Sequence, residues 1–358
     1  MGVGMKKTVT SLFVALLLVQ PAGASPLLSG ASGSGCSLSL TRVGTLPVVV
    51  NVPDAYTANT PDPVTDAMKA WAEAVMRLGS NAKQSADARE KLHAALMTAA
   101  NSNALSWPSN WSSGRDRPPS VIYHTMETLF PAIVAYGQNR SAFTEQERDI
   151  FEIWAGSIID RLGKTDKIRS WKTDNKKYQF GALSAAYGVI TGKQKFLSSG
   201  TKIYKSAIGS MRKDGSLPGD TERGGSSLHY SNLAIANLVA IAEYASDAGL
   251  DLYAYQSGGK SIHLAIQFLA AAQNDPNLIA GYARRTDQGT GSFDGFSAEK
   301  QDRRWAQGPD VLWGYSYIKR FGKTETGQAL LAASPFLKSG KGGVHQQSGG
   351  NTRCFVNG

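Results

Sequence analysis

The chain has 358 residues, and its 38 lysines and arginines exceed its 28 aspartates and glutamates, which gives a net charge of +10. Hydrophobic residues make up 42% and aromatic residues 9%, enough apolar material for a large core, so global disorder is excluded. Only two cysteines occur, which excludes a cysteine-based zinc module and a disulfide-dense scaffold, and the five histidines are too scattered for a His-rich metal site.

The first 24 residues have the pattern of a secretory signal peptide. Lys6 and Lys7 precede an apolar stretch over residues 12–19, and small residues lead to a cleavage site after Ala24. The apolar stretch is shorter than the roughly 18 to 20 residues that a membrane-spanning helix needs, so a membrane anchor is the weaker alternative. We therefore expect a periplasmic or secreted protein without stable membrane insertion.

Export would place the two cysteines in an oxidising compartment. There Cys36 and Cys354 are expected to pair and to join both ends of the chain to its body, with two free thiols as the alternative. The positive charge of an exported protein suits an anionic partner. No cluster of basic residues interleaved with aromatic ones is present, which argues against nucleic acid, so an acidic polysaccharide or a membrane surface fits better. We expect a monomer.

Local patterns predict the secondary structure. Residues 25–63 are rich in Gly, Ser, Thr and Pro and predict an extended N-terminal arm with at most one strand, at 48–50. Thr144 and Glu147 form a capping-box pattern. From residue 64 onward apolar residues recur at helical spacing and predict ten helices, over 64–78, 86–100, 121–136, 145–162, 178–190, 196–211, 228–248, 260–272, 306–321 and 326–333. Four glycines are expected to close helices: Gly79, Gly163, Gly192 and Gly249.

This pattern predicts an all-α fold. Successive helix pairs without a sustained heptad pattern disfavour a coiled coil. A stack of helical repeats is the alternative, but no signature recurs every 34 to 40 residues or so. We therefore predict an incomplete α/α toroid of about ten helices over residues 64–335, with a C-terminal tail over 336–358 and long loops over one cleft.

Three long polar loops interrupt the helices, over residues 101–119, 213–227 and 274–305, and loops of this length are often lids or binding segments. The first contains Trp107, Trp111 and Arg115. A tryptophan face can stack on a sugar ring while an arginine pairs with a carboxylate, so these residues are candidates for substrate binding. The alternative is that both tryptophans plug the edge of the core.

The segment 174–178 is the first candidate for chemistry. Asp174 has the character of an N-cap, which places Asn175, Lys176 and Lys177 in the first turn of a helix, where free backbone N–H groups favour an anion. Lysines there oppose the usual preference for acidic residues at a helix start, which favours a functional explanation. A solvated helix face is the alternative.

The second candidate segment contains Arg223, seven residues before Tyr230, at the start of a long helix. The two side chains can converge there. A cation or amide that pairs with a uronate carboxylate acidifies the C5 proton, and a nearby tyrosine can remove that proton and protonate the leaving oxygen at C4. The alternative is a half-buried tyrosine beside a surface arginine.

Together these residues resemble a known family. The second signature segment of the alginate lyases of polysaccharide lyase family five is similar to Asp214-Gly-x-Leu-Pro, Arg223-Gly and Leu228-x-Tyr230-x-Asn232. Their first segment, Asn-Asn-His-x-Tyr-Trp-x-Gly, is similar to Asp174-Asn175-Lys176-Lys177-Tyr178 followed by Gly181. Their C-terminal helix resembles Trp313-x-x-x-Tyr317-x-x-Arg320-Phe321.

The resemblance implies a periplasmic lyase with an α/α-toroid fold that cuts uronate chains by β-elimination, without a metal or other cofactor. It implies that Asn175 holds the uronate carboxylate, that Arg223 assists, and that Tyr230 is both base and acid. Lys176 stands where the family has histidine, and Gln179 where it has tryptophan. A lysine there would neutralise the carboxylate as a point charge. The expected substrate contacts also include Lys177, Tyr178 and His229.

The expected substrate is a 1,4-linked uronate polymer, with mannuronate-rich alginate as the default and polyglucuronate or another acidic exopolysaccharide as the alternative. The products would carry 4,5-unsaturated uronate ends. Two other functions remain open: a non-catalytic polyuronate-binding protein, which the missing histidine favours, and a glycoside hydrolase with a carboxylate pair such as Glu222 and Asp294.

Overall fold

The computed structural model describes residues 38–40, 42–50, 63–107, 119–170, 172–283, 308–346 and 350–352. Within these ranges nearly all regular structure is helical. The elements, in chain order, are α2 (Pro63–Asn81), α3 (Ala86–Asn101), α4 (Pro119–Gln138), η2 (Arg140–Ala142), α5 (Glu145–Gly163), α6 (Asp166–Arg169), α7 (Asn175–Thr191), α8 (Gln194–Ser210), α9 (Pro218–Thr221), η3 (Gly224–Ser226), α10 (Ser227–Asp247), α11 (Ile262–Asn274), α12 (Asn277–Ala283), η5 (Pro309–Val311), α14 (Gly314–Phe321), α15 (Glu325–Ala333), α16 (Pro335–Lys338), β1 (Val344–His345) and β2 (Gly350–Asn351).

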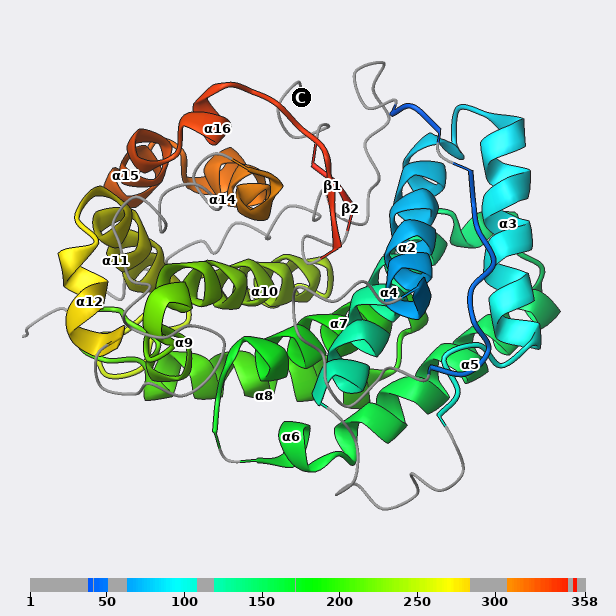
Figure 1. The fold of residues 1–358 in the computed structure, drawn as a ribbon, viewed down its shortest axis with the longest axis horizontal. Helices are drawn as coiled ribbons and strands as arrows, with labels where there is room; N and C mark the ends of the chain where they lie inside the picture. The colour runs from blue at the N-terminus through cyan, green and yellow to red at the C-terminus, as the bar shows by residue number, and fades with distance from the viewer. Residues whose placement is uncertain are drawn as a thin grey trace, which may run out of the picture.

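The helices follow one another around an open ring. Figure 1 shows them curving from α2 and α3 at one end, through α7 and α10 in the middle, to α14, α15 and α16 at the other end. The antiparallel strands β1 and β2 lie between the two ends of the ring. The predicted all-α class is confirmed. No helix in the described ranges is both long enough and apolar enough to span a membrane.

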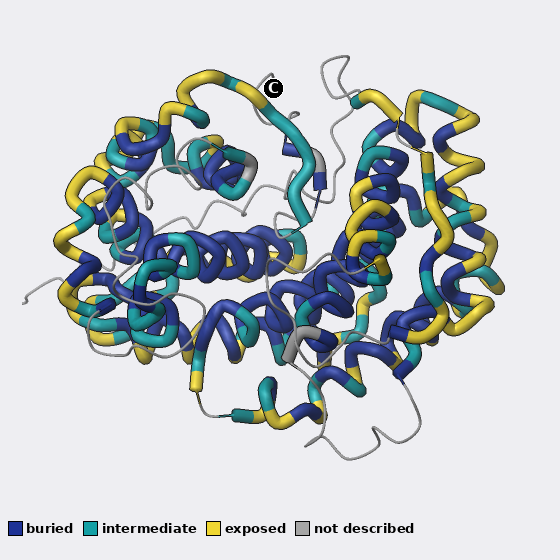
Figure 2. Tube along the Cα trace, in the orientation of Figure 1, coloured by how far each residue is buried: buried dark blue, intermediate teal, exposed yellow. Residues whose placement is uncertain are grey.

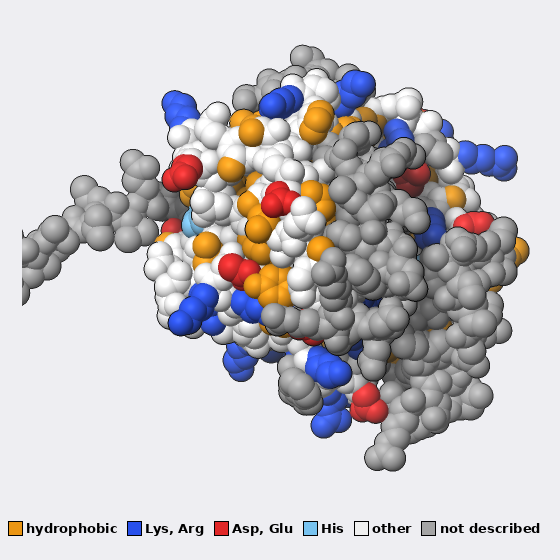
Figure 3. Space-filling model, turned by 60° about the vertical axis from the view of Figure 1, so that its left-hand side comes forward, with side chains coloured by type: hydrophobic (Ala, Val, Ile, Leu, Met, Phe, Trp, Pro, Cys, Tyr) orange, Lys and Arg blue, Asp and Glu red, His pale blue; other side chains and the backbone are white. Residues whose placement is uncertain are grey.

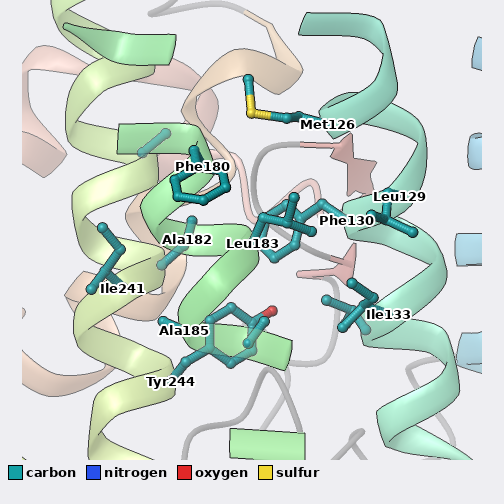
Figure 4. Close-up of a cluster of buried hydrophobic side chains, with 14 of the residues drawn as sticks. Met126, Leu129, Phe130, Ile133, Phe180, Ala182, Leu183, Ala185, Ile241 and Tyr244 are labelled. Carbon is teal, nitrogen blue, oxygen red and sulfur yellow. The ribbon is translucent and has the colours of Figure 1, made fainter. Parts of the chain in front are cut away.

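The core lies where three central helices meet. Met126, Phe130 and Ile133 of α4 pack against Leu183 of α7 and Tyr244 of α10 (Figure 4). Figure 2 shows that α10 is buried along most of its length, whereas the outer face of α3 is exposed. Because neighbouring helices cover α7 and α10 on several sides, their sequences are apolar nearly all round, as expected for central helices.

Most helix ends follow their local sequence signals. The capping box of α5 is present, since Thr144 accepts the Glu147 N–H and the Glu147 side chain accepts the Thr144 N–H. Gly192 ends α7 with a left-handed φ of 70°, a conformation that costs glycine little. The prediction for Gly79 was wrong, because α2 continues to Asn81. A side chain at Gly79 would bring its Cβ within 2.8 Å of the Cβ of Ala135, so this glycine serves the close packing of α2 on α4.

Each of the ten predicted helices has a counterpart, and the differences lie in the loops. The helix predicted over 306–321 begins only at Gly314, after the 3-10 turn η5. Short 3-10 turns often precede an α-helix and carry no apolar period of their own. The loops predicted over 213–227 and 274–305 hold the short elements α9, η3 and α12. In the N-terminal arm, Val49 forms an isolated bridge with Ser106.

Several predictions fall outside the described residues. These are the signal peptide over residues 1–24, the pairing of Cys36 with Cys354, and the proposed roles of Trp111, Arg115 and Asp294.

Candidate active site

The two candidate segments are held together at the start of α7. Asp174 is the N-cap, and its Oδ1 accepts the Lys177 N–H at 3.2 Å. The Asn175 N–H donates to Oδ1 of Asp220 on α9 at 2.9 Å. The backbones also approach closely, since a Cβ on Gly219 would lie 2.1 Å from the Thr173 carbonyl oxygen. Only glycine fits there, and the contact brings the Asn175 segment beside the loop that carries Arg223.

Arg223 lies on the ring of Tyr230. Its guanidinium carbon is 4.2 Å from the ring centroid, which is the geometry of a cation–π contact and confirms the predicted convergence. Both side chains are half-buried. The Nε of Arg223 is buried and has no hydrogen-bond acceptor within the described part of the chain.

Lys176 adds a second positive charge. Its Nζ lies 6.0 Å from the ring centroid of Tyr123 on α4. Burial lowers the pKa of the Lys176 ammonium group, the charges of Lys167 and Arg223 lower it further, and the carboxylates of Asp174 and Glu127 oppose this shift. A buried ammonium group whose pKa is lowered by burial and by neighbouring cations is stabilised when an anion binds beside it. The arrangement therefore favours an anionic ligand.

The structure places three residues of α4 on this side that the sequence analysis did not assign to the site. Tyr123 lies under Lys176, and Glu127 is near enough to influence its charge. His124 is buried, and its Nδ1 lies 3.2 Å from Oε2 of Glu127. The sequence could have indicated this group. Tyr123, His124 and Glu127 are at positions i, i+1 and i+4 of an otherwise apolar helix, and this spacing puts them on one face.

His229 lies beside Tyr230 and contacts a later part of the chain. Its Nδ1 is 3.6 Å from Oδ2 of Asp310, which is in η5. Asn232, one turn further along α10, donates to the Asp310 carbonyl oxygen at 2.9 Å and accepts the Trp313 indole N–H at 2.7 Å. Asn232 is fully buried, so its role is to join α10 to the segment before α14.

Two expected substrate contacts are wrong because the side chains are in the core. Tyr178 is fully buried. Trp107 is 8% exposed, its indole N–H donates to Thr125, and the Arg161 guanidinium covers its ring at 4.7 Å from the centroid. Neither ring can stack on a sugar without unpacking the protein, so for Trp107 the alternative of a plug at the core edge is the correct one.

Other candidates are engaged in local contacts. The Lys177 ammonium group donates to the Ser170 carbonyl oxygen at 2.5 Å and ties the end of α6 to α7. The Glu222 carboxylate is paired with the Arg212 guanidinium, which occupies one member of the carboxylate pair considered for a hydrolase.

The positive charge of the chain is not gathered in one place on the face shown in Figure 3, where basic side chains are scattered singly. A cavity of about 590 Å³ lies between the N-terminal arm, α2 and α3, and none of its lining residues belongs to the signature segments. Among the described residues, no group of three or more His, Cys, Asp or Glu is arranged to hold a metal ion. The candidate active site is the group of Arg223, Tyr230, Asn175 and Lys176, because the Arg223 guanidinium lies on the Tyr230 ring and near Lys176, and Asp220 holds the Asn175 backbone beside that loop.

Asp220 is the buried link of this site, and its removal should destabilise the fold. Asp220→Ala leaves the Asn175 N–H without its acceptor, which we expect to cost about 1 to 3 kcal/mol of unfolding free energy. Asp220→Asn keeps an oxygen there and should cost less. Denaturant titration of both variants measures the difference, and two variants as stable as the wild type would contradict the role of this bond.

The same carboxyl predicts a pH effect. Burial and the neighbouring Asp174 carboxylate raise the pKa of Asp220 well above 3.8, so the native state holds this proton more tightly than the unfolded chain does. The stability of the wild type relative to Asp220→Asn should therefore fall as the pH rises from about 4 through the raised pKa. Titrations at a series of pH values test the sign.

Comparison with known proteins places these segments in context. The family model described as alginate lyase matches residues 51–279. An alginate lyase of Pseudomonas syringae is 29% identical over 142 residues, which cover 38% of this chain and 36% of the relative. A polysaccharide lyase of Stenotrophomonas maltophilia is 27% identical over 42% of this chain and 48% of the relative. The alignments thus span about a third to a half of the length of these curated relatives.

The fold has solved counterparts. Alginate lyase A1-III in complex with a tetrasaccharide has a TM-score of 0.71 at 20% identity, over 97% of this chain and 99% of that one. The structure of alginate lyase A1-III from Sphingomonas species A1 has a TM-score of 0.69 at 21% identity, over 92% and 89% of the two chains. At this identity the likeness shows the fold, and it confirms the predicted α/α toroid.

Proposed function

Because the chain belongs to the alginate lyase family, we propose that it is a polysaccharide lyase that cleaves alginate by β-elimination. The observation that carries the proposal is the Arg223 guanidinium lying 4.2 Å from the Tyr230 ring centroid and close enough to Lys176 to lower its pKa. Asn175, buried at the start of α7, precedes Lys176 directly. These groups supply the two things that the reaction needs, which are neutralisation of a carboxylate and a group that moves a proton.

The proposed step begins with the uronate carboxylate. Pairing with Arg223, Lys176 and the Asn175 amide withdraws charge from it and stabilises the carbanion character that develops at C5. The Tyr230 phenolate removes the C5 proton and becomes a phenol, the electron pair of the C5–H bond forms the C4=C5 double bond, and the bond from C4 to the glycosidic oxygen breaks. Tyr230 then returns the proton to the leaving oxygen. No water is consumed, and the new non-reducing end is unsaturated.

We propose mannuronate-rich alginate as the preferred polymer. In β-mannuronate the C5 proton and the C4 oxygen lie on the same face of the ring, so one tyrosine can serve as both base and acid. The same holds for β-glucuronate, which differs only at C2, whereas guluronate would need a base on the opposite face. Polyglucuronate is therefore the second candidate substrate.

Ultraviolet absorbance of the unsaturated product tests the function directly. The purified mature protein is incubated with mannuronan, polyguluronate and polyglucuronate, and absorbance is followed together with the formation of reducing ends. Both signals should rise together on mannuronan. Binding without either signal would favour a polyuronate-binding protein, and reducing ends without absorbance would favour a hydrolase.

Lys176 should be the residue that most affects the pH profile. Lys176→Ala removes a cation from the site and should weaken substrate binding and slow turnover by roughly tenfold or more, since charge-assisted contacts contribute about 1.5 to 3 kcal/mol. In the wild type, burial lowers the pKa of Lys176, so its charge is lost, and activity falls, at a lower pH than for an exposed lysine.

The matched variant is Lys176→His, which restores the residue type of the family. An imidazole titrates near pH 6.5 and a lysine ordinarily near 10.4, so the loss of the positive charge should move down in pH by a few units. Profiles of kcat/KM against pH on mannuronan and on polyglucuronate measure the shift. Superimposable profiles of wild type, Lys176→Ala and Lys176→His would remove Lys176 from the site.

The location of the protein is a further part of the proposal. We propose export through a signal peptide over residues 1–24, followed by action as a monomer in the periplasm or outside the cell. N-terminal sequencing of the mature protein should begin at Ser25, and a thiol assay under denaturing conditions should find Cys36 and Cys354 oxidised.

A further inference from the structure

The C-terminal hairpin connects the two ends of the helical ring. Strands β1 and β2 pair antiparallel, with Val344 opposite Asn351 and His345 opposite Gly350. Figure 1 shows the hairpin between α14 and α2. It packs on α2 and α4 at the N-terminal end of the ring, where Gly350 faces Val134 and Gln138, and β1 also packs on η5 at the other end. The hairpin thus spans the opening of the ring.

One side chain of the hairpin reaches toward the candidate active site. Nε2 of His345 lies 3.3 Å from Oδ1 of Asp310, and the other oxygen of Asp310 lies 3.6 Å from Nδ1 of His229. One carboxylate therefore lies against two imidazoles, from β1 and from the first turn of α10. The 3.6 Å separation from His229 is beyond hydrogen-bond distance, so that contact is electrostatic. All three side chains are largely buried, with exposed fractions of 18%, 18% and 27% for His345, Asp310 and His229.

The residue after His229 is Tyr230, so this chain of contacts ends beside the proton-transferring group. The backbone of Asp310 is fixed independently by Asn232, one turn along α10. Asp310 is thus held by α10 through its carbonyl oxygen, and its carboxylate lies between His345 and His229. Helix ends fray more readily than helix centres. Contacts that hold the first turn of a helix in place therefore also fix the positions of the side chains in that turn.

We propose that His345 is a positioning residue for the elimination reaction, acting through Asp310 and His229 to hold the first turn of α10, and with it Tyr230, in its productive place. The predicted effect of His345 on turnover rests on the proposed lyase function, whereas its effect on the start of α10 does not. It gives the C-terminal hairpin a role in the site although the hairpin lies more than 100 residues from Tyr230 in the sequence.

The test compares His345→Ala with a matched control elsewhere in the ring. The control is His93→Ala, because His93 on α3 also contacts a carboxylate, with its Nε2 3.0 Å from Oε1 of Glu147. The first readout is amide hydrogen exchange over residues 227–232. Exchange there should be faster in His345→Ala and unchanged in His93→Ala. This readout does not depend on activity, so it decides the inference even if the wild type cleaves no polyuronate.

The second readout is turnover. In His345→Ala we expect kcat to fall roughly 10- to 100-fold with little change in KM, since small displacements of a reacting group carry penalties of that order. His345→Gln places an amide N–H where Nε2 stood and should recover most of the rate. Asp310→Asn should lower kcat similarly, and combining it with His345→Ala should add little more, because both changes break one chain of contacts.

Two outcomes would overturn the inference. One is unchanged hydrogen exchange over residues 227–232 in His345→Ala. The other is faster exchange there without any fall in kcat in an active enzyme, which would reduce His345 to a structural tether of the hairpin.

Discussion

Tyr230→Phe should abolish turnover while leaving polysaccharide binding nearly intact. The change removes only the oxygen that the proposed mechanism uses twice, first as base and then as acid. A single general acid or base contributes typically about 10²- to 10⁴-fold, so the loss should reach or exceed that range. The ring remains, and with it the cation–π contact to Arg223 at 4.2 Å, so the fold and the carboxylate pairing should persist.

The measurement is kcat on mannuronan, alongside the dissociation constant for a mannuronate oligomer. Tyr255→Phe is the matched control, because Tyr255 is a partly buried tyrosine packed near Tyr204, away from the signature segments. It should keep wild-type turnover. Turnover of Tyr230→Phe within a factor of a few of the wild type would remove Tyr230 from its role.

Arg223→Lys should have the second largest effect. A guanidinium can stack on the Tyr230 ring with its face and still donate hydrogen bonds to a carboxylate from its edge, and a lysine ammonium cannot do both. Loss of an electrostatic donor from an active site costs roughly 10²- to 10³-fold in kcat, and we expect a fall in that range. Because Arg223 pairs with the carboxylate in the ground state as well, KM should also rise.

Arg161→Lys provides the comparison for Arg223. Arg161 also lies over an aromatic ring, with its guanidinium carbon 4.7 Å from the Trp107 centroid, and it donates to the Leu105 carbonyl oxygen at 3.1 Å. This variant should lose stability and keep its kinetics, whereas Arg223→Lys should do the reverse. If kcat and KM are unchanged in Arg223→Lys, Arg223 is a surface charge without a role in catalysis.

The sequence alone determined the helices, because the signals that set them are local. Within the described residues, apolar spacing predicted a counterpart for each of the ten helices of eight or more residues, although the one predicted over 306–321 begins only at Gly314. Caps such as Thr144 with Glu147 and the Asp174 N-cap are present as the sequence indicated. The pair Arg223 and Tyr230 was also within its reach, since a loop that leads directly into a helix brings residues seven apart close together.

Tertiary structure alone decided which polar side chains reach the site. The Lys176 ammonium group lies near the Tyr123 ring of α4, while Tyr178, two positions further along α7, is fully buried. Apolar periodicity could not separate them, because α7 is covered on several sides and has no single apolar face. Trp107 likewise entered the core although its loop is polar.

Contacts between distant segments were also beyond the sequence. The bond from the Asn175 N–H to Asp220 spans 45 positions, and Asp310 contacts both His229 and His345. No local pattern specifies which segments meet when a ring of helices closes, since that depends on how every helix in between packs. The residue types of the site were therefore readable in the sequence, and the buried carboxylates that position them emerged only from the folded ring.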